Sequence, residues 1–104
     1  MSEPKSKEIH EEKLFRELSK RWSEATGFYS RVDRKVNHPL YREIIEIGPS
    51  VIPCLLRDMR DNPGYWSDAL VELTGEDPVP DDAETLDAIA VAWVDWGRNH
   101  GYEL

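Results

Sequence analysis

The chain has 104 residues, of which 39% are hydrophobic and 33% charged, and its formal net charge at pH 7 is −8. This size is typical of one domain, and this balance excludes a disordered chain. The single cysteine, Cys54, excludes an internal disulfide and fits a reducing compartment. The N-terminal "MSEPKSKEIHEEK" lacks the apolar core of a secretory signal. No apolar run approaches the roughly 20 residues that span a bilayer, so we expect a cytoplasmic protein without a membrane helix.

Charge divides the chain into two unequal parts. Residues 1–43 carry ten Lys or Arg against eight Asp or Glu, whereas residues 44–104 carry three against thirteen. The second part is therefore strongly acidic. It repels nucleic-acid phosphates, which makes nucleic-acid binding there improbable, and it favours a basic partner. Solubility alone is the competing explanation of this charge.

The first part contains two amphipathic segments. We expect residues 1–8 to be frayed and a helix to follow over about residues 8–26, ending at Gly27. Its predicted face has helical spacing and comprises Glu11, Leu14, Phe15, Leu18, Trp22 and Ala25. A second helix is predicted to begin at Pro39, with His38 as a possible cap, and to end before Gly48. Residues 28–37, with the basic cluster Arg31–Lys35, form either a linker or a short helix, and we favour the linker.

In the second part, the proline in "VIPCLL" is compatible with a helix. If Ser50 is the N-cap, Pro53 lies in the first turn, where no intrahelical hydrogen bond is lost. The apolar stripe of this helix is Val51, Ile52, Leu55, Leu56 and Met59. We predict a further helix that is capped by Asn62, begins at Pro63 and ends at Gly75.

The last predicted helix follows the loop "EDPVPDD" and stops near Gly101. Asp81 and Glu84 have the spacing of a capping box at its start. Its apolar face is Leu86, Ile89, Ala90, Trp93, Trp96 and Gly97. We expect Trp93 and Trp96 to be buried, with Trp66 close to them, because large rings dominate small cores.

These segments predict an all-α fold, a single helical domain over residues 1–104. We expect four or five helices, packed as antiparallel helical hairpins because the connecting turns are short. Residues 48–80, "GPSVIPCLLRDMRDNPGYWSDALVELTGEDPVP", resemble a HEAT-type repeat unit in the "VIP-x-LL" opening, "ALVEL" and the following "DPV". Trp66 departs from that pattern, in which a smaller aliphatic residue is more frequent.

A broader resemblance covers "TGFYS", "HPLYREIIEIG", "NPGYW", "ALVELTGEDPVP" and "AWVDWGRNHGY". Together these segments resemble a small bacterial family of helical proteins with no assigned activity. The resemblance implies one compact helical domain and transfers no catalytic residue. A HEAT-like unit implies protein binding by analogy.

Candidate chemistry is sparse. Cys54 is the only possible thiol nucleophile and would need His38 within hydrogen-bond reach as its base. The acidic 76–87 loop could bind a cation, but it lacks the alternating ligands and central glycine of an EF-hand. No two histidines have zinc-ligand spacing. We therefore predict no catalytic residue, no metal site and no cofactor.

Three functions remain open. The leading hypothesis is a non-catalytic protein-interaction module, such as an antitoxin-like inhibitor that covers a basic partner, for example a nuclease. The first alternative is an inhibitor that mimics DNA. The second is an enzyme or metal-binding protein that uses Cys54, His38 and the 76–87 loop.

We predict that the partner-facing surface lies on the last helix and the acidic loop. Val91 and Val94 are expected to be exposed between charged residues, an apolar centre with a charged rim as in small interfaces. The predicted surface comprises Val91, Val94, Asp87, Asp95, Glu76, Asp77, Asp81 and Asp82. Self-association through this helix, giving a homodimer, is the competing explanation.

Overall fold

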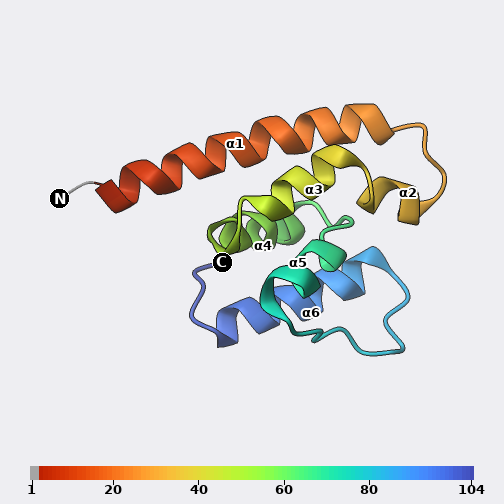
Figure 1. Ribbon diagram of the computed structural model, residues 1–104. Coiled ribbons are helices and arrows are strands. Elements are labelled where there is room, and N and C mark those ends of the chain that lie inside the picture. Colours follow the sequence, from red (N-terminus) through yellow and green to blue (C-terminus); the bar gives the residue numbers. More distant parts are fainter. Residues whose placement is uncertain (1–2) are drawn as a thin grey trace. The chain divides into compact units, whose positions relative to one another are not determined.

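The computed structural model describes residues 3–104, with side chains from residue 10 onward. All regular elements in this range are helical, which confirms the all-α class (Figure 1). The helices are α1 (Glu3–Thr26), α2 (Val32–Val36), α3 (Pro39–Glu46), the 3₁₀ turn η1 (Pro49–Val51), α4 (Ile52–Asp61), α5 (Ser67–Thr74) and α6 (Leu86–Asn99). Residues 1 and 2 of the expected frayed segment lie outside the described residues, and the backbone from residue 3 onward is already part of α1.

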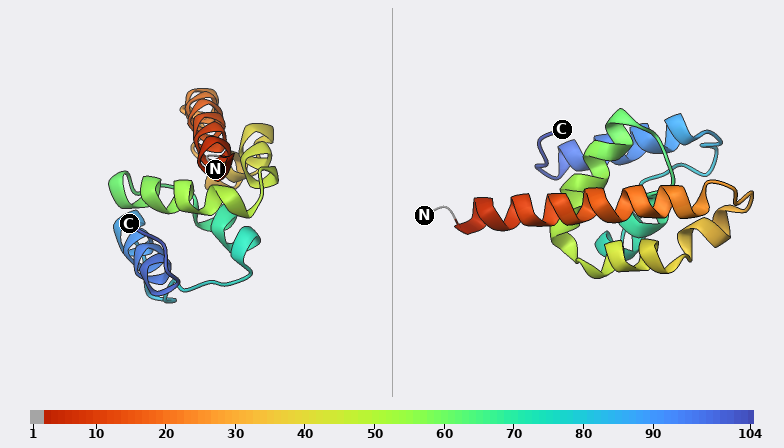
Figure 2. Two further views of the ribbon diagram at one scale, coloured as in Figure 1. Left: turned by 90° about the vertical axis from the view of Figure 1, so that its left-hand side faces the viewer. Right: turned by 90° about the horizontal axis from the view of Figure 1, so that it is seen from above.

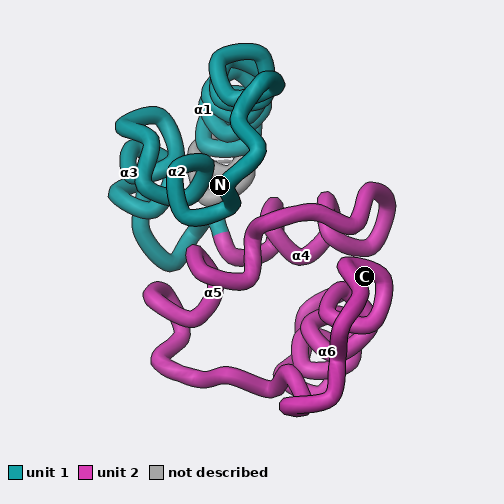
Figure 3. Tube along the Cα trace, turned by 90° about the vertical axis from the view of Figure 1, so that its right-hand side faces the viewer, with its two compact units in different colours: residues 1–51 teal, residues 52–104 magenta. Residues whose placement is uncertain are grey.

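The chain divides into two compact units, residues 1–51 and residues 52–104 (Figure 3). The division falls at the start of α4, close to the change in charge seen in the sequence. A single helical domain over residues 1–104 stays a prediction, because compactness does not show which segments fold together.

In unit 1, α1 packs along α3 and against η1, while α2 packs on α3 (Figure 2). The buried face of α1 is Phe15, Leu18, Trp22 and Thr26. Leu14 and Ala25, which were expected on this face, are exposed. Thr26 replaces Ala25 because its hydroxyl donates to the Trp22 carbonyl at 2.8 Å, which satisfies it in a buried position.

The Trp22 side chain connects α1 with α2 and α3. It meets the ring of Tyr41 on α3 with centroids 5.4 Å apart, and its Nε1 donates to the Lys35 carbonyl at 2.7 Å. That carbonyl belongs to α2, so the segment that we favoured as a linker is in fact a short helix fastened to α1. His38 caps α3 as expected, because its Nδ1 accepts from the Leu40 N–H at 3.1 Å.

In unit 2, α4 packs chiefly against α6, and the shorter α5 contacts both. The predicted stripe of α4, from Val51 to Met59, is entirely buried. Gly97 lets the two helices approach, since a Cβ there would lie 2.9 Å from a methyl carbon of Leu56. The principal partner of α4 is thus α6 and not its neighbour in sequence, so the HEAT-like hairpin packing is not confirmed.

Three helix starts differ from the predictions. Ser50 lies inside η1 and donates to Glu11 at 2.6 Å, so it does not cap α4; Pro53 still falls in the first turn. The helix α5 begins at Ser67 rather than Pro63, because the Trp66 indole is tied to Asp58 at 2.7 Å and Gly64 disfavours a helical start. Gly75 ends α5 in the left-handed conformation, with φ 73°, as expected.

The cap of α6 also differs from the prediction. The Thr85 hydroxyl oxygen accepts from the Ala88 N–H at 3.0 Å, which is the interaction of an N-cap residue. Asp81 and Glu84 are therefore not the capping pair; they lie in the loop before the helix. This loop, residues 75–85, contains no helix and leads from α5 to α6 (Figure 2).

Candidate functional site

The outer face of α6 carries an exposed valine between charged residues. Asp87, Val91, Asp95 and Arg98 follow one another at helical spacing, and all four are exposed. Val91 is 60% exposed, the largest value of any aliphatic side chain among the exposed large hydrophobic residues that the structure describes. The predicted apolar centre with a charged rim is therefore present at Val91.

Val94 was expected on the same surface, and this expectation is wrong. It is only 8% exposed. Val94 shares a helical face with Ala90 and Gly97, which are also buried, and Gly97 marks the close approach to α4. The apolar face of α6 is wider than a single stripe because the helix packs against both α4 and α5.

The first groove lies on one side of Val91, between α6 and the loop that contains Pro78 and Pro80. We call it the proline-side groove; it is open and has a volume of about 630 Å³. Its apolar lining is Pro78, Pro80, Ala83, Ala88, Val91, Ala92 and Trp96, and its polar lining is Asp82, Asp95, Asn99 and His100. No lysine or arginine is among these residues.

The second groove lies on the other side of Val91, toward α4. We call it the arginine-side groove; its volume is about 300 Å³, and it is lined by Met59, Arg60, Pro63, Asp87, Ala90, Val91, Val94, Asp95 and Arg98. Arg60 forms a bidentate pair with Asp61, with atoms 2.8 and 3.1 Å apart. Hydrogen bonding to the Arg60 guanidinium holds the pKa of Asp61 below its ordinary value.

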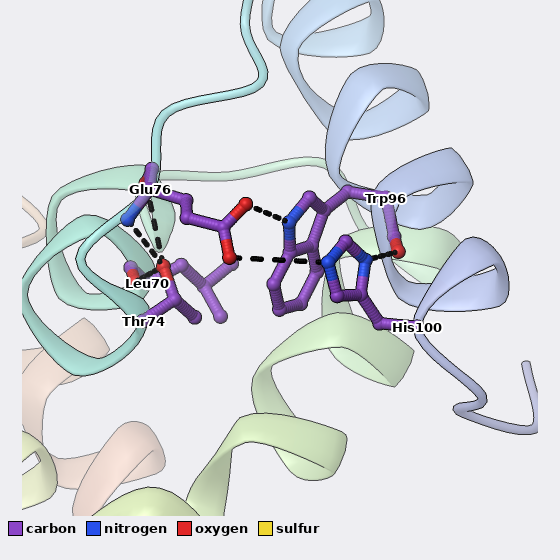
Figure 4. A network of polar contacts seen from close by, with 5 residues as sticks. All are labelled: Leu70, Thr74, Glu76, Trp96 and His100. Atoms are coloured by element: carbon purple, nitrogen blue, oxygen red, sulfur yellow. Dashed lines mark hydrogen bonds and ion pairs between the residues drawn. The ribbon is translucent and has the colours of Figure 1, made fainter.

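The carboxylates of the 76–87 loop have separate roles. Glu76 is part of a polar network: its Oε1 accepts from the Trp96 indole at 3.1 Å, and its backbone N–H donates to Thr74 (Figure 4). Asp77 accepts from the Val79 N–H at 3.2 Å and so shapes the loop. Asp81 and Asp82 are exposed, and of these two only Asp82 lines the proline-side groove. The loop thus offers one carboxylate to that groove.

Trp96 forms one wall of the proline-side groove and is held by aromatic neighbours. The rings of His100 and Tyr102 stack on it, with centroid distances of 4.2 and 5.9 Å. His100 donates from Nδ1 to the Trp96 carbonyl at 2.8 Å, and its Nε2 lies 3.8 Å from Glu76 (Figure 4). Sequence reasoning missed His100 and Tyr102, although the spacing of four between Trp96 and His100 places both side chains on one face.

The residues of the enzyme hypothesis are distributed over both units. Cys54 lies in α4 of unit 2 and is half-buried, whereas His38 caps α3 in unit 1. The side chains that the structure describes contain no group of three or more His, Cys, Asp or Glu with metal-binding geometry. In the same range, no helix is both long and apolar enough to cross a membrane.

A second exposed apolar patch lies in unit 1, beside the basic segment. Phe28 is 100% exposed, and Tyr29 and Val32 are also exposed. Arg31 is paired with Asp33 at 2.9 Å, so part of the positive charge of this segment is balanced locally.

Comparisons with protein-family models, with curated proteins and with solved structures found no match to this chain. The resemblance to a small bacterial helical family stays a prediction.

Proposed function

We propose that this chain is a non-catalytic interaction module that binds a basic protein through α6 and the adjoining loop. The observation that carries the proposal is Val91, exposed on α6 between Asp87 and Asp95 and bordered by a groove on each side. An apolar centre surrounded by charge is the arrangement of small protein interfaces.

The charge of the region supports a basic partner. Residues 44–104 carry three Lys or Arg against thirteen Asp or Glu. Such an excess accelerates encounter with a positively charged protein, and the acceleration falls with ionic strength. A partner with a basic catalytic cleft, such as a nuclease, would be inhibited when the acidic surface covers that cleft. This charge supports an antitoxin-like or inhibitor role.

A DNA-mimicking inhibitor would use the same carboxylates in a different way. It requires carboxylates spaced like phosphates, and it has no need for an apolar centre. Val91, Pro78 and Pro80 favour a mixed apolar and acidic contact instead. Loss of the Val91 side chain distinguishes the two binding modes. It should weaken a mixed apolar and acidic contact but have little effect on a DNA mimic.

The test is capture of the partner by the whole chain and by two matched valine variants. Val91→Lys places a positive charge at the centre of the proposed surface. Val32→Lys makes the same change at an exposed valine of unit 1. We expect the unmodified chain and Val32→Lys to retain a protein that Val91→Lys loses, and to release it as salt increases.

The captured protein must also be inhibited. The activity of the captured protein should fall as the chain is added and reach its minimum at a fixed molar ratio of the two proteins. The Val91→Lys variant should not lower this activity. Equal capture by all three chains would show that α6 is not the binding surface. Absence of any captured protein in extracts of the native host would refute the interaction role.

A further inference from the structure

The proline-side groove has the make-up of a site for one long, cationic side chain. Its volume of about 630 Å³ lies within the range of small-ligand sites. Its apolar lining extends from Pro78 and Pro80 on the loop to Val91 and Trp96 on α6. A side chain with an apolar stem and a polar end would bury the stem here.

The charges of the groove select a cation. Its only carboxylates are those of Asp82 and Asp95, and neither has a hydrogen-bond or ion-pair partner among the side chains that the structure describes. No lysine or arginine of the lining neutralises them. Both carboxylates are therefore able to accept from a ligand.

Along residues 78–80 the loop wall offers no free backbone donor to an anion. Pro78 and Pro80 have no N–H, and the N–H of Val79 donates to Asp77. Anionic groups and peptide carbonyls would find no backbone partner along residues 78–80 of this wall. This part of the wall therefore favours a side chain that donates hydrogen bonds over an added β-strand.

Arginine fits this chemistry better than lysine. Its guanidinium is planar and weakly hydrated, offers five donors in a fork, and binds carboxylates in a bidentate manner. Lysine provides a compact and strongly hydrated charge, which is harder to place between apolar walls. We propose that the proline-side groove binds an arginine side chain of an extended segment of the partner, with its stem on the prolines and Val91 and its guanidinium at Asp82 and Asp95.

This inference rests on the proposed function and specifies its ligand. The test uses the full chain and a capped peptide, Gly-Leu-Arg-Leu-Gly. The control peptides carry citrulline, which is neutral and similar in shape, or lysine at the central position. Binding is followed by NMR through the indole N–H of Trp96, which is assigned by its loss in Trp96→Phe.

Two carboxylate variants locate the site. Asp82→Asn changes the proline-side groove, whereas Asp87→Asn removes the same charge beside the arginine-side groove. We expect the arginine peptide to shift the Trp96 signal with millimolar or tighter affinity. Asp82→Asn should weaken binding about tenfold, the usual effect of one charge-assisted hydrogen bond. Asp87→Asn should leave the affinity within about twofold.

The outcomes separate this inference from the proposed function. Equal binding of the citrulline peptide, or equal weakening by the two variants, would overturn the arginine site. The arginine site would also be overturned if 10 mM peptide, a concentration that corresponds to a binding free energy of roughly 2.7 kcal/mol, caused no shift of the Trp96 signal. A captured protein that depends on Val91 but not on Asp82 would leave the interaction role intact and refute only the arginine site. A larger shift of the Trp96 signal with the lysine peptide would show that arginine is not the preferred ligand and would overturn the proposal.

Discussion

The two grooves beside Val91 share two residues and differ in charge. Val91 and Asp95 line both, but the proline-side groove adds Asp82 without any arginine, whereas the arginine-side groove adds Arg60 and Arg98. The first groove therefore attracts a cation, whereas in the second the carboxylates of Asp87 and Asp95 are balanced by the two guanidinium groups. Exposure of an apolar residue therefore does not define a binding site by itself, because the neighbouring charges differ from one side of that residue to the other.

The largest expected effect is the loss of stability when Trp93, which packs beneath the exposed face of α6, is replaced by alanine. Trp93 is fully buried on the inner face of α6, and its indole donates to Ser67 of α5 at 2.9 Å. Trp93→Ala should lower the free energy of unfolding by about 3–5 kcal/mol, measured by urea denaturation. A loss below about 1 kcal/mol would show that Trp93 is not a core residue.

The second prediction separates the two valines of α6. Val94→Lys should destabilise the chain by at least about 2 kcal/mol, because it removes buried apolar surface and brings a charge into the core side of the arginine-side groove. Val91→Lys should change stability by no more than about 0.5 kcal/mol, as at other exposed positions. Thermal unfolding of both variants checks this difference. Similar stabilities would contradict the assigned faces of α6.

The third prediction concerns the proline-side groove alone. Glu76→Ala removes the acceptor of the Trp96 indole and should cost about 1 kcal/mol of stability. It should also broaden the indole N–H signal of Trp96 and leave that of Trp66 unchanged, since Trp66 donates to Asp58. NMR spectra of the unmodified chain and of Glu76→Ala provide the measurement. An unchanged Trp96 signal would mean that Glu76 does not hold this wall.

The smallest effect belongs to the arginine-side groove. The pKa of Asp61 is lowered by its hydrogen bonds with Arg60, so the pair stabilises the fold above the ordinary pKa of an aspartate. This contribution is lost as pH falls through the lowered pKa. Asp61→Asn should remove that part of the acid dependence, with only a slight change at neutral pH because the pair is exposed. Unfolding midpoints from pH 7 to pH 2.5 test the prediction, and identical acid profiles would contradict it.

Periodicity predicted most of the helices and the buried tryptophans, because the spacing of apolar residues directly reports a helical face. It failed where a tertiary contact competes with local sequence. The α5 start is delayed by the Trp66–Asp58 bond, and Val94 is buried by the approach of α4 at Gly97. Neither partner is adjacent in sequence, so no local pattern reveals them.

The candidate site was predicted in part. Val91 and the acidic residues beside it followed from the helical wheel. The groove itself did not, since Pro78 and Pro80 reach α6 only through the path of the 75–85 loop. No role was predicted for His100, whereas it stacks on Trp96. The roles of Glu76 and Asp77 within the loop also depend on backbone geometry that composition does not specify.

Photo-crosslinking from α6 shows directly whether its exposed face contacts a basic protein. A p-benzoylphenylalanine is placed at position 91 in one chain and at position 32 in another, both exposed valine positions, and each chain is expressed in the native host. We expect a covalent adduct with a basic protein from position 91, at a yield that falls with salt, and none of that protein from position 32. An adduct with the same protein from position 32 but not from position 91 would contradict this expectation.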